Sequence, residues 1–188
     1  MSGSVGLILI GIVLIAVILW AVLGGQRRQA AFKQVARDLG GRYLGSGKVE
    51  AHIEKWTVNL QVSSTSDGKH TYTYTRMHAP FENRDAFELS LFQAGAAGRV
   101  PTALVAQDIH TGDPGFDGAF TIWSNNPSKA RNLLADARIR QMIQQQPGIR
   151  LTVKGRELQF ETKGAVGDVS RLEALFDLFK VLLSALER

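Results

Sequence analysis

Hydrophobic and polar residues follow three different patterns along the 188-residue chain. Residues 5–25, VGLILIGIVLIAVILWAVLGG, form an apolar run without a charged side chain. From about residue 48 to residue 123 apolar and polar residues alternate, and after residue 126 apolar residues recur every three or four positions in two stretches. Alternation is typical of half-buried strands. Recurrence of apolar residues every three or four positions is typical of amphipathic helices. We therefore expect a membrane span, then a sheet, then helices.

The apolar run is long enough to cross a bilayer. At about 1.5 Å per helical residue, its twenty-odd positions cover roughly 30 Å, the thickness of a hydrocarbon core. A cleaved signal peptide would have a basic start and a shorter apolar run, and a buried core helix would keep a polar stripe. We therefore predict that residues 1–25 hold a short tail and an uncleaved transmembrane helix.

Basic residues flank this run on its C-terminal side. The four residues before the run carry no charged side chain, whereas four basic residues follow within 12 positions of its end. The positive-inside rule then places the N-terminus outside and the remainder of the chain in the cytoplasm. An aromatic side chain near the inner end of the run fits a lipid interface. The predicted lipid-contacting residues are Trp20, Arg27, Arg28, Lys33 and Arg37.

Residues 26–41 have the pattern of a basic juxtamembrane helix. In a helix, one face would carry the apolar residues Phe32, Val35, Ala36 and Leu39. The pair Gly40–Gly41 is a suitable helix end. One interpretation is a helix that lies on the membrane and senses lipid. The other, which we favour, is a helix that continues the span and docks on the domain, because its apolar stripe is short.

The net charge of +5 is concentrated next to the apolar run. Residues 26–41 carry a balance of +3, whereas residues 42–188 hold 18 basic and 16 acidic side chains, a balance of +2. We therefore assign the basic excess to anionic lipid and expect no nucleic-acid binding. The chain has no cysteine, which excludes thiolate catalysis and sulfur-ligated zinc.

Residues 42–188 are enough for one domain. The alternating pattern predicts strands, and Asp67–Gly68 predicts a two-residue hairpin turn that would pair Val62 with Thr73 and Leu60 with Thr75. The predicted strands are 48–53, 56–62, 69–78, 86–92, 102–107 and 116–123.

Helical signals dominate the last third of the chain. Asn126 and Pro127 predict the start of a helix that ends before Pro147–Gly148, a hairpin follows over 149–162, and Asp168 predicts the start of a Leu-rich final helix. The economical fold is α+β, a mainly antiparallel sheet with two amphipathic helices on one face. We expect the apolar side of the final helix to be core, with homodimer contact as the alternative.

One acidic loop could carry chemistry. Asp108, His110, Asp113 and Asp117 lie close in sequence, and carboxylates with an imidazole can bind a divalent cation or transfer protons. Gly112–Gly115 is, however, also ordinary turn sequence. We favour the turn, assign no catalytic residue, metal or cofactor, and keep His110, Asp113 and Asp117 as the catalytic candidates.

A second candidate is the polar side of the strand at 69–78. Tyr72, Tyr74 and Arg76 share this side with His70 and His78. Aromatic and Arg side chains are common anchors of protein interfaces, although exposed antiparallel strands also carry them. We predict a binding surface formed by Tyr72, Tyr74 and Arg76.

The run TGDPGFDGAFTIWSNNPSKARNLLAD at 111–136 resembles uncharacterised bacterial membrane proteins with a cytoplasmic domain of unknown function. Their shared pattern is T-G-D-x-x-F-D-x-x-F, a polar turn, a helix, a hairpin and a terminal Leu-rich helix. The resemblance implies a bacterial origin and an α+β order, and it transfers no catalytic residue.

We therefore predict a membrane-anchored, non-enzymatic binding or scaffold domain at the cytoplasmic face of a bacterial inner membrane. Its partners would be the lipid bilayer and a membrane-proximal protein. The first alternative is a membrane-tethered hydrolase or metal-dependent enzyme that uses Asp108, His110, Asp113 and Asp117. The second is a lipid-surface sensor that acts through the helix at 26–39.

Overall fold

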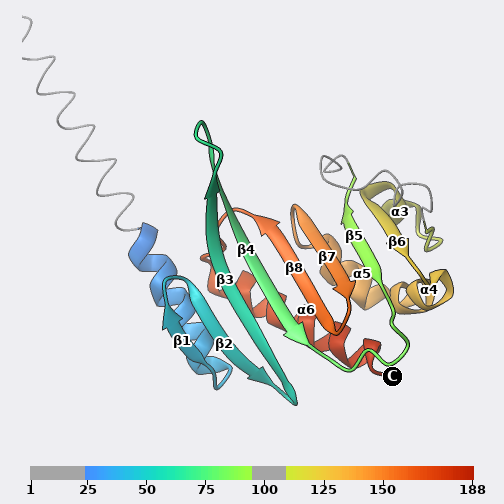
Figure 1. The fold of residues 1–188 in the computed structure, drawn as a ribbon, viewed down its shortest axis with the longest axis horizontal. Helices are drawn as coiled ribbons and strands as arrows, with labels where there is room; N and C mark the ends of the chain where they lie inside the picture. The colour runs from blue at the N-terminus through green and yellow to red at the C-terminus, as the bar shows by residue number, and fades with distance from the viewer. Residues whose placement is uncertain (1–23, 95–108) are drawn as a thin grey trace, which may run out of the picture.

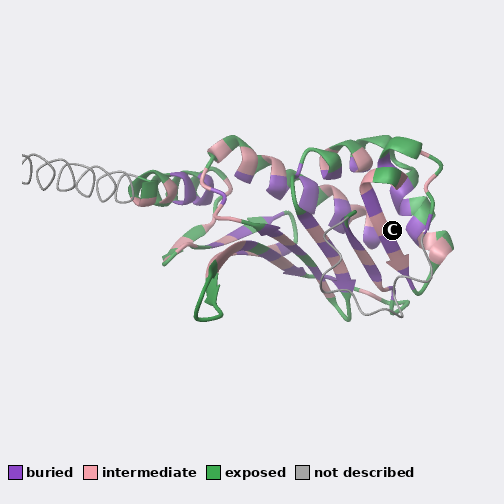
Figure 2. Cartoon of the chain, turned by 90° about the horizontal axis from the view of Figure 1, so that it is seen from above, coloured by how far each residue is buried: buried purple, intermediate pink, exposed green. Residues whose placement is uncertain are grey.

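The structure is a computed structural model that describes residues 24–94 and 109–188. These residues form an eight-stranded sheet of antiparallel pairs in the order β1-β2-β3-β4-β8-β7-β5-β6. The main helices lie along one side of this sheet (Figures 1 and 2). The described chain is therefore an α+β domain with one helical layer on one sheet.

The strands are β1 (Arg42–Gly45), β2 (Lys48–Ile53), β3 (Trp56–Ser66), β4 (Thr71–Pro80), β5 (Leu89–Gln93), β6 (Phe120–Ser124), β7 (Ile149–Lys154) and β8 (Glu157–Lys163). The helices are α3 (Pro114–Ala119), α4 (Pro127–Ala135), α5 (Ala137–Gln144) and α6 (Val169–Leu186). Residues 24–38 are also helical, and we call them the 24–38 helix.

The predicted transmembrane helix requires a correction. Within residues 24–94 and 109–188, the helices all fall short of the length or apolarity that a bilayer crossing requires. Most of the apolar run lies in residues 1–23, outside the described residues, as does the predicted strand at 102–107. The fold class is thus an eight-stranded antiparallel sheet with helices. The single-pass arrangement, and the inner-membrane location inferred from it, have no support in the described chain.

The 24–38 helix packs on the domain. Phe32, Val35 and Ala36 are at most 2% exposed and belong to the same hydrophobic core as the sheet. The helix ends where Gly41 N donates to Ala36 O at 2.7 Å and Gly40, at φ +62°, turns the chain away. Its apolar stripe therefore covers the sheet near β1 and β2, as the docking interpretation predicts.

The β3–β4 hairpin differs from the predicted register by two residues. Leu60 pairs with Met77 and Val62 with Thr75, so the turn has four residues. The Asp67 side chain accepts hydrogen bonds from the backbone N of Lys69 at 3.0 Å and of His70 at 2.7 Å, which favours the longer turn. A shift of two residues leaves every side chain on its predicted side of the sheet.

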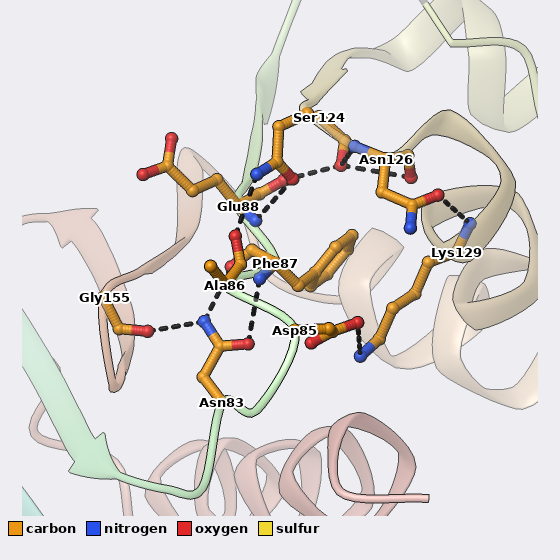
Figure 3. Close-up of polar contacts among 10 residues, drawn as sticks. Asn83, Asp85, Ala86, Phe87, Glu88, Ser124, Asn126, Lys129 and Gly155 are labelled. Carbon is orange, nitrogen blue, oxygen red and sulfur yellow. Dashed lines mark hydrogen bonds and ion pairs between the residues drawn. The ribbon is translucent and has the colours of Figure 1, made fainter.

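Polar contacts fix the connection from β4 to β5, residues 81–88 (Figure 3). Asn83 Nδ2 donates to Phe87 O and to Gly155 O, and Asn83 Oδ1 accepts from Phe87 N. Lys129 Nζ lies 2.7 Å from Asp85 Oδ2. The connection is thereby attached to the β7–β8 turn on one side and to α4 on the other.

Two predicted elements differ in the middle of the chain. The first half of the strand expected at 116–123 is the short helix α3, because Asp113 and Pro114 provide a helix start. The single helix expected from residue 127 is divided into α4 and α5 at Asp136, whose side chain accepts from Arg138 N at 2.8 Å. More than two helices therefore cover the sheet.

The β7–β8 hairpin lies between β4 and β5 in the sheet, and α6 packs beneath it. Eight apolar side chains of α6 are at most 4% exposed, and Phe179 meets Phe160 of β8 edge to face at 6.5 Å between ring centroids. The apolar side of α6 is thus buried by the sheet of its own chain. It offers no apolar surface for the homodimer contact considered from the sequence.

Glu187 connects the end of α6 to two other segments. Its carboxylate accepts hydrogen bonds from Trp56 Nε1 and Glu82 N, each at 3.0 Å, and pairs with Lys55. Burial opposes ionisation of Glu187, but these three donors outweigh it and lower its pKa from 4.5 to about 2. The charged carboxylate therefore stabilises the folded state.

Gly41 provides a test of the packing near β1. A Cβ added at Gly41 would meet the backbone O of Glu50, so we expect Gly41→Ala to lower the free energy of unfolding by about 2 kcal/mol. Gly25→Ala is the control, because its added Cβ has no heavy atom within 4 Å. Urea unfolding measures the midpoints of both variants and of the wild type. A midpoint of Gly41→Ala equal to that of the wild type would contradict this close approach.

Glu187 predicts a pH dependence of stability. Because its pKa is lower in the folded than in the unfolded state, its contribution is complete above pH 4.5 and disappears as the pH falls towards 2. We expect Glu187→Gln to cost on the order of 2 kcal/mol at pH 7 and almost nothing at pH 2. Urea titrations of both proteins across this range measure the difference, and a pH-independent difference would refute the assignment.

Candidate functional site

The side of the sheet opposite α6 carries the polar side chains of the central strands. Thr75, Met77 and Ala79 of β4 are buried, whereas Arg76 and His78 between them face the other side. Strands β7 and β8 alternate in the same way. We call this surface the open face. Its side chains are Tyr72, Tyr74, Arg76 and His78 of β4, Arg150, Thr152 and Lys154 of β7, and Glu157, Gln159, Glu161 and Lys163 of β8.

The strand register brings charged residues from distant parts of the chain together. Glu161 is the cross-strand partner of both Arg76 and Arg150. Arg76 Nε donates to Glu161 Oε2 at 2.6 Å, and His78 Nδ1 lies 2.8 Å from Glu157 Oε1. These five side chains line an open hollow of about 410 Å³. The open face is thus a hollow with charges of both signs.

The residues predicted to form a binding surface lie at one end of the open face. The Tyr74 ring centroid lies 5.5 Å from the Arg76 guanidinium carbon, and Tyr72 lies beside His70 at 6.0 Å between rings. Arg76 also donates to Ser63 Oγ at 3.1 Å. Tyr72, Tyr74 and Arg76 therefore lie on one surface, and their use as an interface stays a prediction.

The sequence did not reveal that β8 and β7 extend this surface. Residues 149–162 were expected to form a hairpin, and Arg150, Glu157 and Glu161 fall at its polar positions. That alternation is the signal that could have marked them as exposed. Their position beside Arg76 depends on the pairing of β8 with β4, which joins segments about 85 residues apart and leaves no local signature.

The acidic loop has a structural role in the described residues. Asp113 is the N-cap of α3, accepts from the backbone N of Gly115 and Phe116, and pairs with Arg140 at 3.2 Å. Asp117 accepts from Thr111 N at 2.8 Å, from Thr111 Oγ1 at 2.7 Å and from Gly112 N at 3.2 Å. Asp108 lies outside the described residues.

The electrostatics of this loop agree with its hydrogen bonds. The bond from Phe116 N is the main cause that lowers the pKa of Asp113, and Arg140 adds to it. Burial would raise the pKa of Asp117, but the donors of Thr111 and Gly112 outweigh it and lower the pKa. His110 is exposed and 3.8 Å from Asp117. Within the described chain, no three His, Asp or Glu side chains converge as metal ligands.

The basic residues of the 24–38 helix lie away from the open face. Arg27, Lys33 and Arg37 are exposed, and Lys33 Nζ is 5.8 Å from the centre of the Tyr43 ring. Arg28 is half-buried, and Trp20 lies outside the described residues. Because the apolar side of this helix is buried in the core, the lipid-sensor alternative lacks the apolar surface that membrane insertion requires.

Comparisons with known proteins give one structural likeness. No family model and no curated protein match the chain. The fold is similar to the crystal structure of the mycobacterial trehalose monomycolate transport factor A, TtfA, at 15% identity and a TM-score of 0.48. The match covers 86% of this chain and 95% of that chain. This likeness assigns no function, and the resemblance of residues 111–136 to uncharacterised bacterial membrane proteins stays a prediction.

The hydrogen bonds of Asp117 predict the result of its removal. We expect Asp117→Ala to lower the free energy of unfolding by about 2 kcal/mol, because three donors lose their acceptor. The control is Asp177→Ala, at an exposed position of α6, which should change stability little. Addition of Mg²⁺ or Zn²⁺ should leave the melting temperature of the wild type unchanged. A rise of several degrees that Asp117→Ala abolishes would favour a metal site instead.

Proposed function

We propose that the chain is a non-enzymatic binding domain that holds a protein partner on its open face. The observation that supports the proposal is the hollow formed by β4, β8 and β7, lined by Arg76, His78 and Glu157 among others. Arginine and tyrosine side chains are enriched at the anchors of protein interfaces, because they combine large contact areas with directed polar groups.

The sheet beneath the hollow makes this surface rigid. Leu151, Phe160 and Met77, the inward neighbours of the hollow residues, are at most 1% exposed. A packed core of this kind fixes the backbone positions from which the outward side chains project, which lowers the entropic cost of binding. Other faces are less suitable, since the apolar sides of α6 and of the 24–38 helix are already buried.

The acidic loop contributes no catalytic group to this proposal. Asp113 caps α3, and Asp117 of α3 accepts hydrogen bonds from Thr111 and Gly112 of the same loop. The loop and Arg140 account for the contacts of both carboxylates without a substrate or an ion. We therefore assign no reaction to this loop.

Crosslinking of the full-length protein in the cells that produce it tests the proposal. We expect the double variant Tyr74→Ala, Arg76→Glu to lower the yield of its crosslinked partner about tenfold, because an anchor is removed and a charge is reversed. The matched control is Arg131→Glu, at an exposed position of α4 in the helical layer. We expect it to give the same yield of crosslinked partner as the wild type.

Urea midpoints within error of the wild type would show that both variants are folded. Equal capture of the same partner by the wild type, the double variant and the control would contradict the proposed role of the open face. Loss of the partner in Arg131→Glu alone would place the interface on the helical layer instead.

A further inference from the structure

The positive charges of the open face are incompletely neutralised. Two carboxylates are engaged, Glu161 with Arg76 at 2.6 Å and Glu157 with His78 at 2.8 Å. Three other cations of the same face, in the part of the chain that the structure describes, have no ion-pair partner. They are Arg150, Lys154 and Lys163. Disregarding the histidine, the face carries four cations and two carboxylates.

One carboxylate serves two arginines at the centre of the hollow. Glu161 is the cross-strand neighbour of Arg76 and of Arg150, but its hydrogen bond goes to Arg76. Arg150 lines the hollow beside Thr152 and is half-buried, and within the described chain it has no carboxylate of its own. A second carboxylate, supplied from outside, would complete this arrangement.

We infer that the partner presents an acidic peptide segment, bound in extended form along β7 and β8 with Arg150 as its anchor. This inference rests on the proposed function of the open face. Along the strand direction Lys163 lies two residues before Arg150 and Lys154 four residues after it. At about 3.3 Å per residue these offsets are roughly 7 and 13 Å, which match side chains at positions i, i+2 and i+6 of an extended peptide.

A peptide fits this face better than a phosphate backbone or a lipid surface. Glu157 and Glu161 lie among the cations and would repel a continuous row of phosphates, whereas a peptide also offers N–H donors to them. Among the described residues, the exposed large apolar side chain is Leu44, on the distant strand β1. The open face therefore lacks the apolar anchors that insertion into a membrane requires.

Binding of a defined peptide by the full-length chain tests the inference. The probe is a fluorescent twelve-residue Ser-Glu repeat, with a Ser-Gln repeat of equal length as its control, measured by fluorescence anisotropy. We expect the Ser-Glu repeat to bind and the Ser-Gln repeat not to bind. Arg150→Gln should weaken binding about fivefold, as loss of one partly exposed charge pair does. Arg131→Gln, in the helical layer, should not weaken it.

A loss of binding in Arg150→Gln could also result from misfolding, so two further variants are included in the test. Lys154→Gln, at an exposed position, should also weaken binding, whereas Glu161→Gln should strengthen it, because it frees Arg76 for the peptide. Added salt should weaken binding to the wild type. An increase in affinity on removal of a carboxylate could not result from a damaged fold.

The inference is wrong if the wild type does not bind the Ser-Glu repeat, or if Arg150→Gln and Lys154→Gln bind it as the wild type does. It is also wrong if phosphatidylglycerol vesicles or a single-stranded oligonucleotide bind in an Arg150-dependent way while the peptide does not. A further outcome is that the double variant Tyr74→Ala, Arg76→Glu loses the cellular partner while the wild type does not bind the Ser-Glu repeat. In that case the proposed function stands, and the inference of an acidic peptide segment is wrong.

Discussion

The packing of α6 against one side of the sheet is the constraint on which the rest of the structure depends. Its eight buried apolar side chains cover the centre of the sheet, where Phe179 meets Phe160. Both ends of the helix are fixed, by the Asp168 side chain that accepts from Arg171 N and by Glu187. Burial on this scale provides most of the driving force for folding, so the apolar residues of the central strands face the helical layer. The polar residues of the central strands are thereby placed on the opposite side.

This one-sided burial explains how the open face is built. Strand β8 brings Glu161 beside Arg76 because its Phe160 must join Met77 in the core. The neighbouring pairing of β7 then adds Arg150 to the same row. The charged hollow thus follows from the packing beneath it, with backbone ladders setting the spacing of its side chains. A surface of this origin is rigid, which suits recognition of a partner.

Local signals in the sequence predicted local structure well. Asn126 and Asp168, the predicted helix starts, each accept a hydrogen bond from the backbone N three residues on, and interactions of this range depend on few neighbours. The β3–β4 register was wrong by two residues because the Asp67 side chain favours a longer turn, yet the side of the sheet was right. The division of α4 from α5 at Asp136 was missed, because the helical pattern continues across it.

The sequence by itself determined which side chains of β2, β3 and β4 are buried and where α4 and α6 begin. It determined them because alternation and capping depend on neighbours along the chain. The tertiary structure alone decided that β8 lies between β4 and β7, and so that Arg76, Glu161 and Arg150 share one hollow. It also corrected the fold class: the mainly antiparallel sheet was predicted, but the described residues have more than two helices on it and no helix that could span a membrane. Strand order depends on how separate apolar faces combine in one core, and the alternation of a single strand does not specify which strand lies beside it.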